Sequence, residues 1–169
     1  MNEWSATAVA DTPEDSIGAQ ELLQLVSFKL GEEEFAVDIL LVQEINRMAE
    51  ITLVPKAPAF VEGVINLRGK IIPVVNLRAR FGLAGAGTGA EARIVVVNVE
   101  NRVLGLLVDS VSEVLRLPAH TIEPPPSFAS GIGTDYIKGV GRIGDRLLIL
   151  LDLAKALAKQ DVPEHEGAA

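Results

Sequence analysis

The pattern of residues 63–77 returns without a gap at residues 139–153, 76 positions later. The glycine that opens each stretch is the same, Gly63 or Gly139, and Asn76 is replaced by the similar Asp152. Most other matched positions exchange one aliphatic residue for another, which is the kind of change that preserves a fold. The sequence therefore indicates an internal duplication.

A second repeated pair supports the duplication. Residues 35–45 align with residues 104–114 at an offset of 69, which places Glu44 opposite Glu113. The two offsets differ by seven residues, so the second copy contains an insertion. The proline- and glycine-rich segment around 124–133 is where we expect that insertion to lie.

Each copy of the 15-residue stretch predicts a β-hairpin. In the first, two runs of branched aliphatic residues flank Arg68-Gly69-Lys70, which places a charged side chain at the turn. Residues 93–99 and 103–108 are further strong strand predictions. We expect helical structure only in short pieces: at 59–62 between a proline and a glycine, at 78–82 where a glycine ends the segment, and in a C-terminal helix from about 152 to 159.

Many short strands and few helices indicate an all-β fold, and two copies suggest two small barrels packed together. We expect one domain over residues 21–157, made of two pseudo-repeated subdomains. The polar ends, residues 1–20 and 158–169, are expected to be flexible tails.

Composition limits the possible functions. The 169 residues carry a net charge of −8 and no cysteine, which disfavours nonspecific binding to nucleic acid and excludes disulfides and thiolate metal sites. The N-terminus lacks the pattern of a secretory signal, and no apolar run approaches the roughly 20 residues of a membrane span. We expect a cytoplasmic protein with no cofactor and no metal.

Candidate catalytic residues are few. His120 and His165 are the only histidines, and neither lies in a recognisable nucleophile motif. The carboxylates Asp38, Glu44, Asp109, Glu113, Asp145 and Asp152 repeat with the duplication, so polar strand faces and turns explain them better than a catalytic pair does. A small enzyme or ligand-binding barrel that uses His120 or these carboxylates remains the alternative hypothesis.

Four segments together resemble the CheW-like family of bacterial chemotaxis coupling proteins. They are residues 35–45 (FAVDILLVQEI), 58–69 (PAFVEGVINLRG), 103–114 and 144–150. The resemblance spans about residues 22–157. It implies two five-stranded SH3-like β-barrels and a non-enzymatic adaptor that bridges methyl-accepting chemoreceptors to the histidine kinase CheA.

The resemblance also implies two sets of contact residues. In the family, the tip of the receptor's helical hairpin lies in a groove between the barrels, and the matching residues here are Val42, Gly63, Arg68, Gly105 and Val114. The residues that match kinase contacts are Ile39, Glu44 and Phe128. The same fold could serve flagellar chemotaxis or another chemosensory pathway, and the sequence leaves that choice open.

Overall fold

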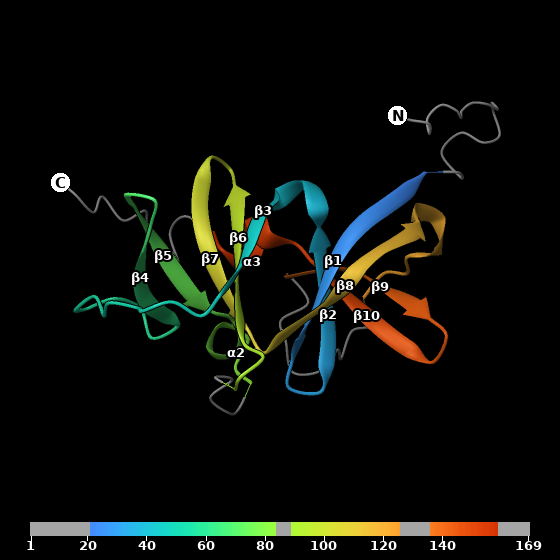
Figure 1. Cartoon of the computed structure of the whole chain (residues 1–169). Helices are drawn as coiled ribbons and strands as arrows, with labels where there is room; N and C mark the ends of the chain where they lie inside the picture. The colour runs from blue at the N-terminus through green and yellow to red at the C-terminus, as the bar shows by residue number, and fades with distance from the viewer. Residues whose placement is uncertain (1–20, 84–88, 126–135, 159–169) are drawn as a thin grey trace.

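The computed structural model describes residues 21–83, 89–125 and 136–158, and these residues form two five-stranded sheets (Figure 1). Sheet A has the order β8 (Ser110–Pro118), β1 (Leu22–Leu30), β2 (Glu33–Asp38), β10 (Arg146–Leu151), β9 (Ile137–Ile143). Sheet B has the order β3 (Val42–Arg47), β6 (Arg93–Val99), β7 (Arg102–Val108), β5 (Lys70–Asn76), β4 (Val61–Leu67). The short helices are η2 (Ile39–Leu41), α2 (Leu77–Arg80), η3 (Ala119–Thr121) and α3 (Leu153–Ala156).

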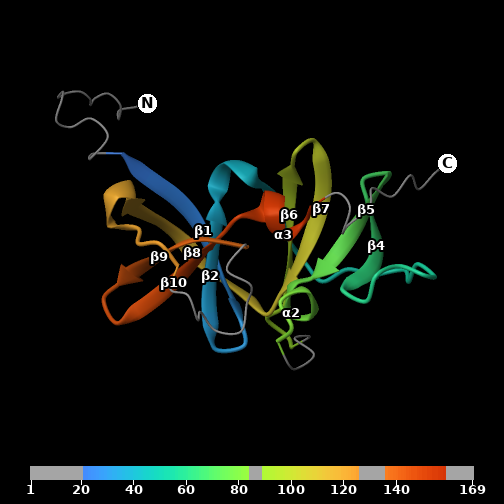
Figure 2. The ribbon, with the colours of Figure 1, turned by 180° about the vertical axis from the view of Figure 1, so that it is seen from behind.

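Each sheet takes strands from both copies of the duplication (Figures 1 and 2). Sheet A combines β1 and β2 of the first copy with β8, β9 and β10 of the second, and sheet B has the reverse composition. The parallel pairs β2–β10 and β5–β7 join the copies at the centre of each sheet. The predicted all-β architecture of two five-stranded units is confirmed, but a unit does not correspond to one copy.

A shared apolar core lies between the two sheets, and β6 shows why its sequence is so uniformly aliphatic. Val95 and Val97 belong to the shared core, whereas Ile94 and Val96 belong to a second cluster on the other face of sheet B. Side chains alternate between faces along a strand, so a strand buried on both faces reads as a continuous apolar run. Sheet A has its own cluster of this kind, built on Leu25, Ala36, Leu117, Leu148 and Leu150.

The two hairpins of the repeat end in matching caps. Asn76 accepts a hydrogen bond from the Ala79 N–H at 3.2 Å, and Asp152 accepts one from the Lys155 N–H at the same distance. Each side chain therefore starts a one-turn helix, α2 or α3, directly after its strand. This shared role explains why the duplication keeps a short polar acceptor at both positions.

The hairpin predicted around Arg68 is confirmed. β4 and β5 pair up to Leu67 and Lys70, which leaves Arg68 and Gly69 as a two-residue loop. Both loop residues have positive φ, 52° and 87°, as a type I′ turn requires, and Asn66 accepts the Gly69 N–H at 2.9 Å.

The predicted helical turn at 59–62 is wrong. Only one turn hydrogen bond forms there, from the Val61 N–H to the Pro58 carbonyl, and β4 begins at Val61 because that residue pairs with Val75.

The C-terminal helix does start after Asp152, but α3 ends at Ala156. Both tails, apart from residue 158, lie outside the described residues, so the predicted domain boundaries stay predictions.

Gly63 and Gly139 occupy equivalent places where a passing segment crosses a strand. Thr52 makes an isolated bridge to Val64, with both hydrogen bonds at 2.8 Å, and Glu123 makes the matching bridge to Val140. A Cβ at Gly63 would lie 2.2 Å from the Thr52 carbonyl oxygen, and one at Gly139 would lie 2.8 Å from the Glu123 oxygen. Close approach of backbone explains why both copies keep this glycine.

We therefore expect Gly63→Ala to lower the free energy of unfolding by about 1–3 kcal/mol or more, because the added methyl group has no free volume and φ is +151°. Urea unfolding followed by circular dichroism measures this. Gly89→Ala is the matched control, since nothing lies within 4 Å of its Cβ, and it should unfold within about 0.5 kcal/mol of the parent. Equal stabilities for the two variants would contradict the backbone-crossing explanation.

Candidate protein-interaction site

The exposed Arg68 guanidinium pairs with the Glu44 carboxylate. One nitrogen, Nη1, donates to Oε1 at 3.3 Å and the other, Nη2, donates to Oε2, so the contact is bidentate. The Arg68 side chain is 72% exposed and that of Glu44 is 25% exposed. Hydrogen bonding from Arg68 lowers the pKa of the Glu44 carboxyl below its ordinary value. Glu44 is on β3 and Arg68 follows β4, so this pair links the two edge strands of sheet B.

Sheet A has a comparable ionic link. Arg146, the first residue of β10, donates to Glu113 on edge strand β8 at 2.9 Å. It also contacts both carboxylate oxygens of the buried Glu34, at 3.1 Å and 2.6 Å. The hydrogen bonds from Arg146 hold the pKa of Glu34 below its ordinary value of 4.5, although burial opposes this effect. Glu44 and Glu113, matched in the sequence repeat, therefore both anchor ion pairs at a sheet edge.

Three of the predicted contact residues lie in one row across sheet B. The register runs from Glu44 to Val96, Gly105, Val74 and Gly63 through successive strand pairs. Val96 and Val74 belong to the core cluster of sheet B. Gly105 is buried between these two valines and Gly63 is buried beside Val74, and a Cβ at Gly105 would lie 2.9 Å from the Ile94 side chain.

This row gives Gly63 and Gly105 a definite packing role. Both glycines allow close approach inside sheet B, so any contribution they make to a partner surface acts through the shape of the sheet. Arg68 and Glu44 are the members of the predicted set that the structure joins directly by a side-chain contact. The assignment of all of them to partner contacts stays a prediction.

The remaining predicted residues are spread over both sheets. Val42 begins β3 in sheet B, and Ile39 lies in η2; both are partly buried against the shared core. Val114 is on β8 of sheet A, where it pairs with Val26 and is 57% exposed. Phe128 lies outside the described residues.

Exposed aliphatic residues around β3 were missed by the sequence reasoning. Leu40 in η2 is 87% exposed, Ile45 on β3 is 41% exposed, and Leu53 in the following loop is 77% exposed. The segment 35–45 is almost continuously apolar, and the 3₁₀ turn breaks its alternation, so periodicity gave no sign of which residues face solvent. Exposed apolar groups of this kind are typical of protein-interaction surfaces.

The two sheets are held together at Asp109, in the connection from β7 to β8. Its carboxylate accepts a hydrogen bond from the Gly31 N–H at 2.7 Å and two from the Arg78 guanidinium at 2.7 and 3.0 Å. Gly31 is in the β1–β2 turn of sheet A, and Arg78 is in α2, which follows β5 of sheet B. Arg78 lowers the pKa of Asp109, with a further contribution from the Gly31 amide. Asp109 therefore links the β1–β2 turn of sheet A to α2, which follows sheet B.

Other kinds of site find little support in the described part of the chain. His120 lies exposed in η3. In residues 21–83, 89–125 and 136–158, no group of three His, Cys, Asp or Glu side chains could hold a metal ion. Within the same residues, no helix is long and apolar enough to cross a membrane.

Comparison with known proteins gives the family. The profile of the CheW-like domain matches residues 24–161. The chain belongs to the CheW-like family. Chemotaxis protein CheW from Klebsiella aerogenes is 40% identical over 155 residues, which covers 92% of this chain and 91% of that protein. Chemotaxis protein CheW from Treponema pallidum is 40% identical over 146 residues, 84% of this chain and 86% of that protein.

A solved structure confirms the CheW-like fold. The crystal structure of the scaffolding protein TtCheW from Thermoanaerobacter tengcongensis matches with a TM-score of 0.77 and 36% sequence identity. The match covers 88% of this chain and 94% of that chain. The chain is thus a CheW-like protein of the kind named for chemotaxis and scaffolding, and the two packed five-stranded SH3-like units implied by the resemblance are confirmed as sheets.

The ion pair at Glu34 predicts a pH-dependent stability. The folded-state pKa of Glu34 is lowered, so the pair stabilises the fold fully above about pH 4.5 and this contribution is lost as pH falls through the folded-state pKa. Urea unfolding at pH 7 and at successively lower pH values measures the loss. Arg146→Gln should flatten this dependence because it removes the donor that lowers the pKa.

Arg142→Gln is the matched control for that measurement. The Arg142 Nε lies 3.9 Å from the Glu123 Oε2, and both side chains are more than half exposed. Its removal should leave the pH dependence as it is in the parent. If Arg142→Gln and Arg146→Gln changed the slope equally, the assignment of the slope to Glu34 would be wrong.

Proposed function

We propose that this chain is a non-enzymatic cytoplasmic adaptor that is recruited to membrane-associated chemoreceptor arrays, where it couples methyl-accepting chemoreceptors to the histidine kinase CheA and supports receptor control of the kinase. The observation that carries the proposal is the exposed Arg68 guanidinium, ion-paired with Glu44, in a CheW-like chain. The chemotaxis and scaffolding names of the relatives are consistent with it, and none of these names describes an enzyme.

The receptor surface in this proposal consists of Val42, Gly63, Arg68, Gly105 and Val114. Arg68 provides the polar contact, because a guanidinium can bind a receptor carboxylate through two parallel hydrogen bonds. Its type I′ turn fixes the backbone, so little conformational entropy is lost there on binding. The valines provide apolar contact, while the buried glycines set the curvature and packing of sheet B.

The kinase surface consists of Ile39, Glu44 and Phe128. Ile39 and Glu44 flank Leu40, whose 87% exposure extends this surface with an apolar side chain. Glu44 also belongs to the ion pair with Arg68. The two surfaces therefore meet at one bidentate contact, which suits a protein that has to hold two partners in a defined relative position.

An adaptor of this kind acts by geometry. A receptor conformation that binds one activity state of the kinase complex more tightly than the other shifts the kinase population toward that state. The size of the shift is limited by the difference between the receptor's affinities for the two states. Weak contacts to receptor and kinase gain strength when several are made at once in an array. Chemical turnover then belongs to the kinase.

Arg68→Glu should abolish most receptor binding in a chain that still folds, because the guanidinium is replaced by a carboxylate that repels an acidic receptor contact. Titration of a receptor cytoplasmic fragment, with receptor-stimulated CheA activity as the second readout, measures the effect. We expect a loss of at least tenfold in affinity, which is the order of a charge-assisted contact broken by truncation.

A charge-swapped variant separates binding from folding. Glu44→Arg combined with Arg68→Glu can re-form an ion pair between the sheet edges with the charges exchanged. We expect this double variant to recover the parent's unfolding midpoint while receptor binding stays lost. Full recovery of receptor binding by the swap would contradict a direct contact from Arg68 and assign it a purely structural role.

A further inference from the structure

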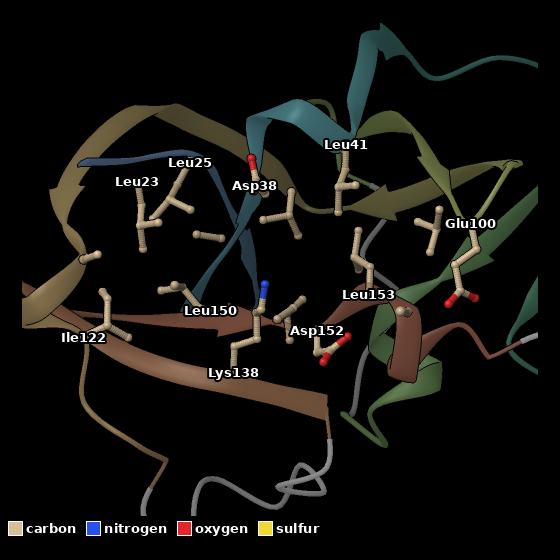
Figure 3. Close-up of a pocket in the computed structure, with 16 residues that line it drawn as sticks. Leu23, Leu25, Asp38, Leu41, Glu100, Ile122, Lys138, Leu150, Asp152 and Leu153 are labelled. Carbon is tan, nitrogen blue, oxygen red and sulfur yellow. The ribbon is translucent and has the colours of Figure 1, made fainter. Parts of the chain in front are cut away.

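A cavity of about 430 Å³ lies beside sheet A, next to the β6–β7 turn of sheet B (Figure 3). Leu25, Ala36 and Leu150 form its floor, on the adjacent strands β1, β2 and β10. Val99, the last residue of β6, and Glu100, in the β6–β7 turn, also line the cavity. None of the residues named above for receptor or kinase contact lines this cavity, although Asp38 and Leu41, which do line it, are the N-cap and the last residue of the short helix that contains Ile39.

Small side chains create the space. Alanines 36, 119 and 154 all line the cavity, each on a different element: β2, η3 and α3. Protein interiors are normally packed to the density of organic crystals, and wall atoms that lack neighbours lose dispersion contacts. An apolar group of matching size would restore those contacts. The volume is within the range of ligand-binding pockets and exceeds what one leucine side chain needs.

Charged groups around the cavity carry a net negative charge. Asp38, Glu100 and Asp152 line it together with a single lysine, Lys138. Asp38 is held by the Leu40 N–H at 2.9 Å and Asp152 by the Lys155 N–H at 3.2 Å, so these two carboxylates are fixed in place. Figure 3 shows the Lys138 side chain rising from β9 into the cavity.

We propose that this cavity is a docking pocket for a partner protein's segment in which a bulky aliphatic side chain is flanked by basic residues. The aliphatic side chain fills the space left by the alanines, and the basic neighbours meet the three carboxylates. Lys138 opposes a basic segment electrostatically, so its charge weakens binding. The proposal goes beyond the adaptor function and does not depend on which receptor or kinase the chain couples.

Two short peptides test the sign of the charge preference. The probes are acetyl-Lys-Leu-Leu-Lys-amide and acetyl-Glu-Leu-Leu-Glu-amide, titrated into the isotope-labelled full chain at low salt and followed by amide chemical shifts. We expect the basic peptide to bind in the millimolar range and to shift amides of Leu23, Ala36 and Ala154. Equal or tighter binding of the acidic peptide would overturn the proposal, as would shifts confined to other surfaces or none at millimolar peptide.

Charge variants at the pocket rim give opposite expectations. Lys138→Gln should tighten binding of the basic peptide about two- to fivefold, and Glu100→Gln should weaken it by a similar factor, as for partly exposed charge pairs. Both changes in peptide affinity should become smaller at high salt, because salt screens the charges. Weakening by Lys138→Gln would show that the pocket favours an anionic group and would overturn the proposal.

Filling the pocket tests its location. Ala119→Phe places a ring in the cavity, and Ala154→Phe does the same from another element if the first variant is unstable. Leu147→Phe is the control, because Leu147 is 54% exposed and does not line the cavity. Circular dichroism verifies that each variant folds. Ala119→Phe and Ala154→Phe should then no longer bind the basic peptide, whereas Leu147→Phe should still bind it. If a folded Ala119→Phe or Ala154→Phe variant still bound the basic peptide, the peptide would bind outside the cavity and the proposal would be wrong.

Discussion

The apolar core between the sheets is the constraint on which the rest of this structure depends. Each sheet takes strands from both halves of the chain, and the shared core contains side chains from both sheets, such as Phe28 and Phe35 from sheet A and Val95 and Leu106 from sheet B. Neither half can complete a sheet by itself. The two sheets should therefore form together, and the Asp109 contacts to Gly31 and Arg78 fix their relative position.

The duplication also accounts for the contacts of Arg80. The Arg80 guanidinium lies 4.7 Å from the Phe60 ring centroid and 4.9 Å from that of Tyr136, and these two rings are equivalent in the repeat. Arg80 also donates to the Ala156 carbonyl at 2.8 Å. One cation thus joins matching parts of the two copies through π contacts and a hydrogen bond.

Local features of the sequence predicted local structure well. The branched aliphatic runs around Arg68-Gly69 were sufficient to predict the hairpin, and the start of the C-terminal helix near Asp152 was also predicted. The pairing of β2 with β10 is different, because it joins residues more than 100 positions apart and depends on the shared core. The helix expected at 59–62 failed for the same reason, since pairing of Val61 with Val75 overrode the local proline and glycine signals.

The candidate site was predictable only in part. Arg68 was identified as an exposed charge at a turn, but its pairing with Glu44 requires the two edges of sheet B to approach, which no local pattern shows. Gly63 and Gly105 were assigned to the receptor surface from the resemblance, and that assignment stays a prediction; their tight packing against Thr52 and Ile94 is a tertiary feature that no local pattern shows. The exposure of Leu40 and the cavity beside Ala36 arise from three-dimensional packing and leave no periodic signal in the sequence.

The most direct test of the adaptor proposal is a binding titration with a chemoreceptor cytoplasmic fragment and the CheA regulatory domain, added separately and then together. Mass measurement of the mixture by analytical ultracentrifugation identifies which complexes form. The proposal predicts a complex with each partner and a ternary complex that contains both. Binding to neither partner, or strict competition between them for this chain, would contradict the claim that it couples receptor to kinase.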